Sequence, residues 1–325
     1  MSAALEPVPL AAIEGARERI AGIAIRTPLV RLGLPDTHPR IFLKLENLQP
    51  IGSFKLRGAA NAMALADRSQ LADGVYTASA GNMAQGVAWA ARALGVRCRV
   101  IVPDTAPETK VAAIERLGGE VVKVPFDVWW QAMVDHGHPD FGGLFVHPFA
   151  DPAVMAGNGT IGLEILEDVP DVDAIVVPYG GGGLSCGIAS AISAVRPDVK
   201  VYAAEVETAA PLAASLAAGR AMRIDTTPSF VDGIGGKGVF DEMWPLAKAL
   251  LAGSRVVSVA AIASAVRTLA ERSRVVAEGA GAAPVAVALE GLVDARTIVC
   301  VISGGNIDSD VLATILRGGI PTKEH

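Results

Sequence analysis

Short runs of apolar, strand-forming residues alternate along the chain with segments whose apolar positions recur every three or four residues. Such strand and helix pairs occur at residues 75–79 with 82–94, 98–102 with 107–117, and 120–124 with 127–134. The helix expected at 107–117 has proline where it begins and Gly118-Gly119 where it ends. Strands separated by single helices pair in parallel through right-handed crossovers. The pattern therefore predicts an α/β fold with mostly parallel sheets.

The same alternation continues after an irregular segment at residues 136–151, which is rich in glycine, proline and phenylalanine. We interpret this segment as a crossing between two domains. Helices are expected at 9–21, 152–167, from 184, near 242–251, at 261–273 and at 308–317, strands at 41–45, 173–178, 200–205, 255–259 and 296–302, and loops at 26–36 and 278–284. We expect residues 1–73 plus 149–325 to form a large domain, and residues 74–148 a small domain inserted in it.

Composition narrows the class of partner. The 325 residues are 51% hydrophobic and 19% charged, which is typical of a globular chain with a sizeable core. A net charge of -6 argues against binding to nucleic acid or to an anionic membrane surface. The longest uncharged run, residues 174–195, is broken by Pro178 and four glycines, so it does not predict a membrane span. A small molecule is the expected partner.

The cysteines and the N-terminus indicate a compartment. Cys98, Cys186 and Cys300 have no CxxC or metal-ligand spacing, and two of them lie inside apolar strand-like runs, where a thiol behaves as a small hydrophobic group. The first residues lack the basic and then apolar regions of a signal peptide. We therefore expect a reduced, cytoplasmic protein.

Four turns carry candidate chemistry, and each follows an expected strand and precedes an expected helix, where open α/β sheets bind ligands. The first is ENLQPIGSFKLRG at residues 46–58, which places Lys55 after Gly52-Ser53 and Phe54. Partial burial at such a turn lowers the pKa of an amine toward the range of a nucleophile or base. Taken alone, the motif favours an ordinary surface lysine at a helix start.

The other three turns offer groups to anions or to a neutral ligand atom. Ser79-Ala80-Gly81-Asn82 brings a hydroxyl, backbone N–H groups and an amide to a helix start, which suits a carboxylate but also an ordinary N-cap. Gly180 to Gly183, with Leu184, place four glycines before a helix, which is typical of a phosphate cradle. Ser303-Gly304-Gly305-Asn306 offers a serine hydroxyl to a ligand, or only a flexible helix start.

Together the four turns resemble the fold-type II, pyridoxal-phosphate (PLP) dependent enzymes, and specifically the serine/threonine dehydratase family. GSFKLRGA, SAGNMAQG, GGGGL, VAEGAGA and SGGN occur in the family's order between residues 26 and 310. The resemblance implies two three-layer αβα domains like those of the tryptophan synthase β subunit, with mostly parallel sheets and PLP in the cleft between them. It also implies a homodimer whose small domain closes on the substrate.

The resemblance assigns a role to each turn. Lys55 would carry the Schiff base to the cofactor, with Phe54 beside the ring, Asn82 bonded to the phenolic oxygen, and Ser303 facing the pyridine nitrogen. The phosphate would lie on Gly180, Gly181, Gly182, Gly183 and Leu184, and the substrate carboxylate on Ser79, Ala80, Gly81 and Asn82.

The reaction implied by the resemblance is β-elimination. Lys55, displaced from the cofactor by the amino acid, would remove the Cα proton. A serine is a poor partner for a pyridinium, so negative charge would leave quickly through the β-substituent as hydroxide. The substrate would be L-threonine, L-serine or a related β-hydroxy amino acid, and the products a 2-oxo acid and ammonia.

Three departures from the family pattern change the expected activity. Met83 replaces the histidine of SAGNHAQG, which makes an unusual β-hydroxy amino acid a candidate substrate. Ala80 replaces the serine with which the family's racemases reprotonate Cα, which disfavours racemisation. Glu205 matches the family's metal-binding glutamate, but Pro211 aligns with the aspartate and has no side-chain ligand, so no metal is expected even with Glu207 nearby.

Several conspicuous residues have ordinary explanations. Glu278, in VAEGAGA, is expected to cap a helix or bond the backbone of its glycine-rich turn rather than to lie near the ring nitrogen. The histidines 136, 138 and 147 cluster in the crossing segment without the partners of a metal site. Trp129-Trp130, in a chain with 5% aromatic residues, indicate core packing, a contact at the mouth of the active site, or a contact between subunits.

Rival functions remain open at this point. On the same fold they are a serine racemase-like or β-replacement activity, or a PLP-binding protein with little turnover, for which Met83 is the only indication. A nucleotide-binding protein would use the glycine loop without PLP, although no Gly-Lys-Ser/Thr follows it. The last expected helix ends close to His325, so a C-terminal effector domain is not expected.

Overall fold

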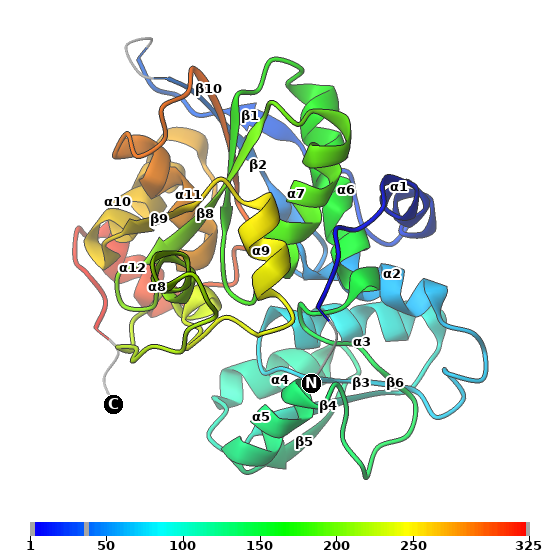
Figure 1. Cartoon of the computed structure of the whole chain (residues 1–325). Coiled ribbons are helices and arrows are strands. Elements are labelled where there is room, and N and C mark those ends of the chain that lie inside the picture. The colour runs from blue at the N-terminus through cyan, green and yellow to red at the C-terminus, as the bar shows by residue number, and fades with distance from the viewer. Residues whose placement is uncertain (1–3, 36–38, 323–325) are drawn as a thin grey trace.

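The computed structural model describes residues 4–35 and 39–322, in which two sheets have helices on both faces (Figure 1). The six-stranded sheet has the order β1-β2-β10-β7-β8-β9, and the four-stranded sheet has the order β5-β4-β3-β6. Only β1 and β2 pair antiparallel among the described strands. The predicted α/β fold with mostly parallel sheets is confirmed.

The strands of the larger sheet are β1 (Leu29–Arg31), β2 (Arg40–Lys44), β7 (Ala174–Pro178), β8 (Lys200–Val206), β9 (Ser254–Val257) and β10 (Thr297–Val301). Those of the smaller sheet are β3 (Val75–Ala78), β4 (Cys98–Pro103), β5 (Glu120–Val124) and β6 (Leu144–Phe145). The expected division into a large domain and an inserted small domain at residues 74–148 stays a prediction, and its termini 1–3 and 323–325 lie outside the described residues.

The helices are α1 (Leu10–Arg19), α2 (Lys55–Leu65), α3 (Asn82–Leu94), α4 (Glu108–Arg116), α5 (Phe126–Val134), α6 (Pro152–Asp168), α7 (Gly183–Val195), α8 (Pro211–Ala218), α9 (Trp244–Leu250), α10 (Val259–Thr268), α11 (Gly279–Leu289) and α12 (Ser309–Leu316). Short 3₁₀ turns occur at η1 (Glu46–Leu48) and η2 (Asp232–Ile234), and a π-helical turn, η3 (Leu269–Ser273), follows α10.

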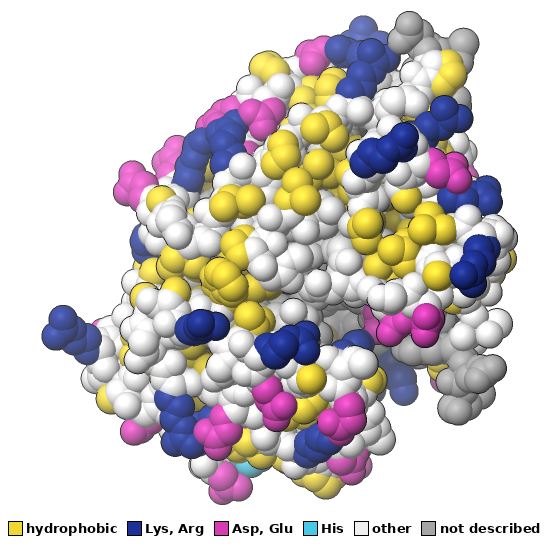
Figure 2. Space-filling model, turned by 180° about the vertical axis from the view of Figure 1, so that it is seen from behind, with side chains coloured by type: hydrophobic (Ala, Val, Ile, Leu, Met, Phe, Trp, Pro, Cys, Tyr) yellow, Lys and Arg dark blue, Asp and Glu magenta, His cyan; other side chains and the backbone are white. Residues whose placement is uncertain are grey.

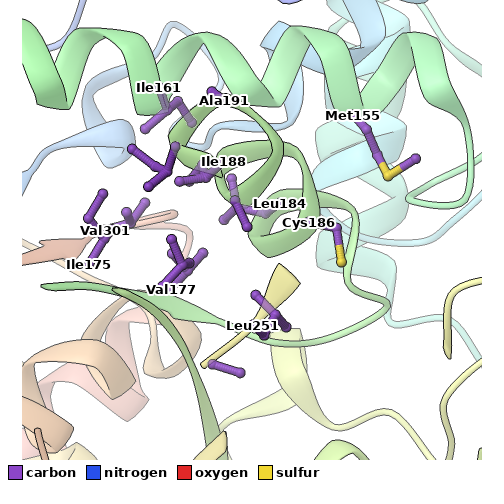
Figure 3. Close-up of a cluster of buried hydrophobic side chains, with 14 of the residues drawn as sticks. Met155, Ile161, Ile175, Val177, Leu184, Cys186, Ile188, Ala191, Leu251 and Val301 are labelled. Atoms are coloured by element: carbon purple, nitrogen blue, oxygen red, sulfur yellow. The ribbon is translucent and has the colours of Figure 1, made fainter. Parts of the chain in front are cut away.

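Helices α6 and α7 pack against one face of the larger sheet, and their side chains meet those of β7 and β10 (Figure 3). The two helices approach closely because glycines face each other at the crossing. A Cβ at Gly187 would lie 2.5 Å from the carbonyl oxygen of Met155, and one at Gly159 would lie 2.9 Å from that of Gly187. The close contact with α6 fixes the first turns of α7, which begins at the end of the glycine loop.

The smaller sheet is covered differently on its two faces. Val75 and Val100 face α3 and α4, whereas Tyr76 and Ile101 face α5. This alternation follows from the period of two along a strand. Helix α2 also packs on α3, so Lys55 at the start of α2 lies beside both sheets.

Three local expectations were wrong. Residues 29–31 form β1 rather than part of a loop, and residues 144–145 form β6 inside the crossing segment, because each pairs with a neighbouring strand. The segment 278–284 is not a loop, because α11 begins at Gly279 and continues past Pro284. Almost all of α11 is buried, so packing outweighs the low helix propensity of its glycines and proline.

The face of the molecule drawn in Figure 2 carries charges of both signs. On the face in Figure 2, Lys and Arg side chains lie among Asp and Glu side chains, with hydrophobic groups scattered between them. None of the helices in the described part of the chain combines the length and the apolar character needed to cross a bilayer.

Candidate active site

The four predicted turns line one pocket of about 700 Å³ between the two sheets. Every residue to which the family resemblance gave a role lies on its wall: Phe54, Lys55, Ser79, Ala80, Gly81, Asn82, Gly180, Gly181, Gly182, Gly183, Leu184 and Ser303. Three of the turns follow β2, β7 and β10, which are neighbours in the larger sheet, and the fourth follows β3 of the smaller sheet, so the structure brings together segments that are far apart in the chain. Their individual roles stay predictions.

Lys55 is half-buried at the first turn of α2, not on the open surface. Its Nζ donates a hydrogen bond to the carbonyl oxygen of Pro148 (2.6 Å) and lies 5.1 Å from the centre of the Phe54 ring. Burial lowers the pKa of the amine to about 8, although the nearby Glu278 opposes the shift. A substantial fraction of the amine is thus neutral at slightly alkaline pH, as a nucleophile or base requires.

The start of α2 is held by a buried cluster of charges that the sequence reasoning missed. Arg57 bonds both oxygens of Glu46 and both oxygens of Glu164, and Lys44 bonds Glu164 (2.5 Å). These four residues, at most 4% exposed, carry two positive and two negative charges. The only sequence signal was an arginine two residues after Lys55 in an otherwise apolar helix start.

The segment 79–82 leaves the start of α3 open to a ligand. Gly81 occupies the N-cap position and no side chain caps the helix, so the ordinary N-cap alternative is wrong. The hydroxyl of Ser79 accepts a hydrogen bond from the Gly81 N–H (3.2 Å). The N–H groups of the first helical turn therefore face the pocket and suit a carboxylate. Met83, which follows, is 2% exposed and also reaches the pocket wall.

The glycine loop combines close packing with an anion site. Gly182 has φ = 92°, and a Cβ at Gly181 or Gly183 would lie 2.3 to 2.5 Å from atoms of Phe149. Packing against Phe149 therefore requires glycine at these positions. This reason adds to the phosphate cradle that the sequence predicted. The N–H groups at the start of α7 and the positive end of its dipole still line the pocket, and they suit a phosphate.

Ser303 is 2% exposed and lies next to the Lys55 turn, because its carbonyl oxygen accepts the N–H of Phe54 (2.9 Å). Among the described residues its hydroxyl has no hydrogen-bond partner, and it lines the pocket. Because Ser303 lines the pocket, its hydroxyl is available to a ligand.

Glu278 is not a helix cap, which corrects the expectation from the sequence. It occupies the N-cap position of α11, but its side chain makes no cap hydrogen bond and instead enters the pocket. Its Oε1 accepts a hydrogen bond from Nδ2 of Asn82 (2.9 Å). Burial, and then the negative charge of Asp232, raise the pKa of this carboxyl to about 8.

The histidines have a partner that the sequence did not indicate. His136 Nε2 lies 2.8 Å from Glu242 Oε1, and the rings of His136 and His147 stack with centres 4.4 Å apart. However, Nδ1 of His147 accepts the N–H of Ala150 (2.7 Å), so Nε2 carries the proton and donates to the carbonyl of Met133 (3.2 Å). Burial also lowers the pKa of His147 to about 3, and the neutral ring has no lone pair left for a metal.

The carboxylates near the family's metal position are engaged by backbone groups. Glu205 accepts hydrogen bonds from the N–H groups of Leu212 and Ala213 at the start of α8 and from the hydroxyl of Ser254. Glu207 accepts the N–H of Val259 (2.8 Å). That no metal binds at Glu205 stays a prediction.

The two tryptophans have different further neighbours, although their own ring centres lie 6.4 Å apart. Trp129 lines the pocket, as expected of a contact at the mouth. Trp130 packs on Phe240 with ring centres 5.6 Å apart and lies under the guanidinium of Arg223, so it joins the α5 side of the small sheet to the segment before α9.

A lysine with a lowered pKa, a glycine cradle for a phosphate and a helix start for a carboxylate define a class of enzymes that hold a phosphorylated aldehyde against a lysine. A family model described as pyridoxal-phosphate dependent enzyme matches residues 20–304. This chain belongs to that family. The glycine cradle and the unpartnered hydroxyl of Ser303 fit PLP, and the predicted cofactor is confirmed.

Relatives narrow the class. An L-threonine ammonia-lyase of Thermotoga maritima is 41% identical over 318 residues, which cover 96% of this chain and 79% of that protein. The structure of maize serine racemase superposes with a TM-score of 0.86 at 32% identity, covering 96% and 98% of the two chains. The T.th. threonine deaminase gives 0.81 at 36% identity, covering 92% and 98%. The predicted resemblance to the serine/threonine dehydratases is confirmed, and with it a PLP-dependent ammonia-lyase.

Proposed function

We propose that this chain converts L-threonine, L-serine or a related β-hydroxy amino acid into a 2-oxo acid and ammonia by PLP-dependent β-elimination. The observation that carries the proposal is the half-buried amine of Lys55 in the same pocket as Ala80. The amine is a base for Cα, whereas the methyl group of Ala80 has no proton to return to it. The names of the Thermotoga relative and of the T.th. structure support the same reaction.

Each turn of the pocket has one task in this proposal. The N–H groups at the start of α3, with Ser79 and Asn82, bind the carboxylate of the amino acid and so fix its Cα near Lys55. The N–H groups of Gly180 to Leu184 bind the phosphate of PLP and use the dipole of α7. The Ser303 hydroxyl makes one neutral hydrogen bond to the pyridine nitrogen.

When bound, PLP supplies an electron sink that stabilises negative charge at Cα. Lys55 Nζ takes the Cα proton, because its lowered pKa leaves it partly neutral at working pH. The neutral Ser303 would not keep the pyridine nitrogen protonated as a carboxylate would. The ring would then stabilise less negative charge, which favours loss of the β-hydroxyl. In this proposal Glu278 acts on Asn82, whose Nδ2 donates to its Oε1, and not on the ring nitrogen.

The identity of the β-substituent is the open part of the proposal. Met83 gives the pocket wall an apolar group where the family has a histidine. Nearer the surface the wall carries Trp129 and the ion pair of Lys110 with Asp232 (2.7 Å), which joins α4 to η2 across the mouth. This mixed mouth fits a β-hydroxy amino acid larger than serine.

A substrate panel tests the proposal. Purified holoenzyme is incubated with serine, threonine and threo and erythro β-hydroxy amino acids carrying aromatic or acidic substituents, and 2-oxo acid and ammonia are measured together with D-serine. We expect a 2-oxo acid from at least one substrate, no D-serine, and no turnover by Lys55→Ala. D-serine without pyruvate would instead establish a racemase, and adducts with added thiols a β-replacing enzyme.

We also propose the finer features that accompany this activity. The pocket wall draws on residues of 74–148 and of the remainder of the chain, which supports two domains, 1–73 plus 149–325 and 74–148, that close on substrate. The described cysteines are all buried thiols, which supports a reduced, cytoplasmic setting. A homodimer follows the family resemblance. Sedimentation of the holoenzyme tests the dimer, and scattering with and without substrate tests closure, which a ligand-independent profile would exclude.

A further inference from the structure

Asn82 is held on both sides by other side chains of the pocket. Its Nδ2 donates to Oε1 of Glu278 (2.9 Å), and its Oδ1 accepts a hydrogen bond from Nδ2 of Asn306 (2.8 Å). The three residues come from the starts of α3 and α11 and from the loop before α12, so the contact joins three of the motifs that line the pocket.

The direction of these hydrogen bonds is fixed by a backbone carbonyl. Nδ2 of Asn306 also donates to the carbonyl oxygen of Ile51 (2.9 Å), which can only accept. Rotating the Asn306 amide would set two oxygens against each other. The second hydrogen of Nδ2 therefore points at Oδ1 of Asn82, and this in turn places the Asn82 Nδ2 toward Glu278. The carboxyl must then accept through Oε1, so a proton on Glu278 resides on Oε2.

Two glycines of the family motifs make room for this chain of hydrogen bonds. Gly52 has φ = 73°, and a Cβ there would lie 2.5 Å from Oδ1 of Asn306. A Cβ at Gly304 would lie 2.5 Å from Oε1 of Glu278 and 3.3 Å from Nδ2 of Asn82. A methyl group at Gly52 would therefore displace the side chain of Asn306, and one at Gly304 would displace that of Glu278.

We propose that Ile51, Asn306, Asn82 and Glu278 form an ordered relay that aims the one unshared N–H of Asn82 at the cofactor, and that Glu278 ends the relay as an uncharged carboxylic acid. Asn306 and Glu278 are positioning residues in this scheme, because they act through Asn82. The inference rests on the proposed function and on the family resemblance, which gives the side chain of Asn82 the phenolic oxygen of PLP.

The charges around Glu278 favour the uncharged form. Asp232 on η2 adds to the effect of burial, whereas Lys110 on α4, Lys55 on α2 and the hydrogen bond from Asn82 oppose it, and the pKa of the carboxyl settles at about 8. Below that pH the relay presents only a donor to the phenolic oxygen. Above that pH Glu278 is ionised, and only the Asn82 amide separates its negative charge from the phenolic oxygen. This charge weakens cofactor binding.

The first test needs no cofactor. Infrared difference spectra of the apoprotein between pH 6 and pH 10 report the C=O stretch of a protonated carboxyl. Glu278→Gln should remove one such band at pH 7, and the band should titrate near pH 8 in the unsubstituted protein. Glu290→Gln, an exposed substitution at the other end of α11, should leave the band unchanged. A spectrum without this band at pH 7 would overturn the uncharged state, whatever the variants do.

The second test measures PLP affinity by absorbance titration of the apoprotein. Because glutamine is also neutral and offers an oxygen to Asn82, Glu278→Gln should stay within about threefold of the unsubstituted protein at pH 7. It should not share the loss of affinity that we expect of the unsubstituted protein above pH 8. Glu278→Ala and Asn306→Ala should each weaken binding about tenfold, the value of one hydrogen bond.

The outcomes separate this inference from the proposed function. If Glu278→Gln loses as much affinity as Glu278→Ala at pH 7, the relay needs a charged carboxylate and the inference fails. If the band and the affinities follow expectation but no β-hydroxy amino acid yields a 2-oxo acid, the proposed function fails while the relay stands. Circular dichroism of each variant excludes misfolding as the cause of lost binding.

Discussion

Two sets of half- or fully buried charges meet at α2, one through Lys55 and the other through Arg57, and their pKa values shift in opposite ways. Beneath the pocket, Arg57 and its partners are fully paired, and the pKa of Glu46 is lowered while that of Arg57 is raised. Inside the pocket, the pKa of Lys55 is lowered and that of Glu278 is raised, both to about 8. In the first set opposite charges outweigh desolvation, and in the second desolvation outweighs them.

The difference teaches how one helix carries both structure and chemistry. Lys55 and Arg57 are two positions apart on α2, so they point to different sides of it. The arginine meets two carboxylates and keeps its charge, which fixes the helix. The lysine meets a carbonyl oxygen and the edge of a pocket, which leaves it able to lose its proton.

The largest expected effect separates the two residues by activity. Lys55→Ala should reduce 2-oxo acid formation by about ten thousandfold or more, because it removes both the attachment of PLP and the base. Its free energy of unfolding should stay within about 1 kcal/mol of the unsubstituted protein, since no paired charge is lost. Turnover assays and urea denaturation of the apoprotein measure the two quantities. Residual turnover above one per cent would remove Lys55 from the proposed role.

Arg57→Met should act on stability first. It leaves Glu46 and Glu164 buried with fewer positive partners, and breaking such a cluster costs about 3–5 kcal/mol. The matched control is Arg97→Met, which breaks an exposed pair with Glu120 and should cost less than about 1 kcal/mol. Urea denaturation compares the two. Equal losses would mean that the buried cluster contributes no more than a surface pair.

The pH dependence of stability should have two slopes of opposite sign. Between the ordinary carboxyl pKa and about 8, the folded state holds the Glu278 proton that the unfolded chain has lost, so stability contributed by this group falls as pH rises. Between about 8 and the ordinary lysine pKa, the unfolded chain holds the Lys55 proton, so stability contributed by that group rises with pH.

Each slope is at most about 1.4 kcal/mol per pH unit for one proton. Glu278→Gln should flatten the first slope and Lys55→Met the second, as measured by urea midpoints from pH 5 to pH 10. If both variants keep the profile of the unsubstituted protein, the titrations belong to other groups.

The smallest expected effect lies at the mouth. Lys110→Met removes an exposed ion pair with Asp232, so the free energy of unfolding should change by less than about 1 kcal/mol. Because Lys110 holds the pKa of Glu278 down, the same substitution should move the titration of Glu278 to higher pH. Infrared titration of the apoprotein tests this, and a shift to lower pH would contradict the arrangement of charges.

The parts of the site that consist of consecutive residues could be predicted from the sequence. The Lys55 turn, the segment 79–82 and the glycine loop each show their strand, turn and helix locally. The first and third follow strands of the larger sheet and the second follows β3 of the smaller sheet, and the pocket lies between the two sheets. The α/β pattern was likewise readable from periodicity.

The features that the sequence could not predict depend on pairs of residues that are far apart in the chain. Glu278 looked like a helix cap until Asn82, 196 residues away, was found to bind it. Arg57 received no role from the sequence, because its partner Glu164 lies 107 residues further on. The segment 278–284 looked like a loop because its glycines and proline disfavour a helix, and only the surrounding core reverses that preference.

Phe149 links the catalytic and the phosphate-binding parts of the pocket. The residue before it, Pro148, accepts the hydrogen bond of Lys55, and its own ring lies against Gly181 and 4.9 Å from the ring of Phe240. Any molecule that displaces the Lys55 amine or lifts the glycine loop must alter the magnetic environment of this ring. A fluorine label on Phe149 would therefore show by NMR whether the pocket is occupied, before a single turnover has taken place.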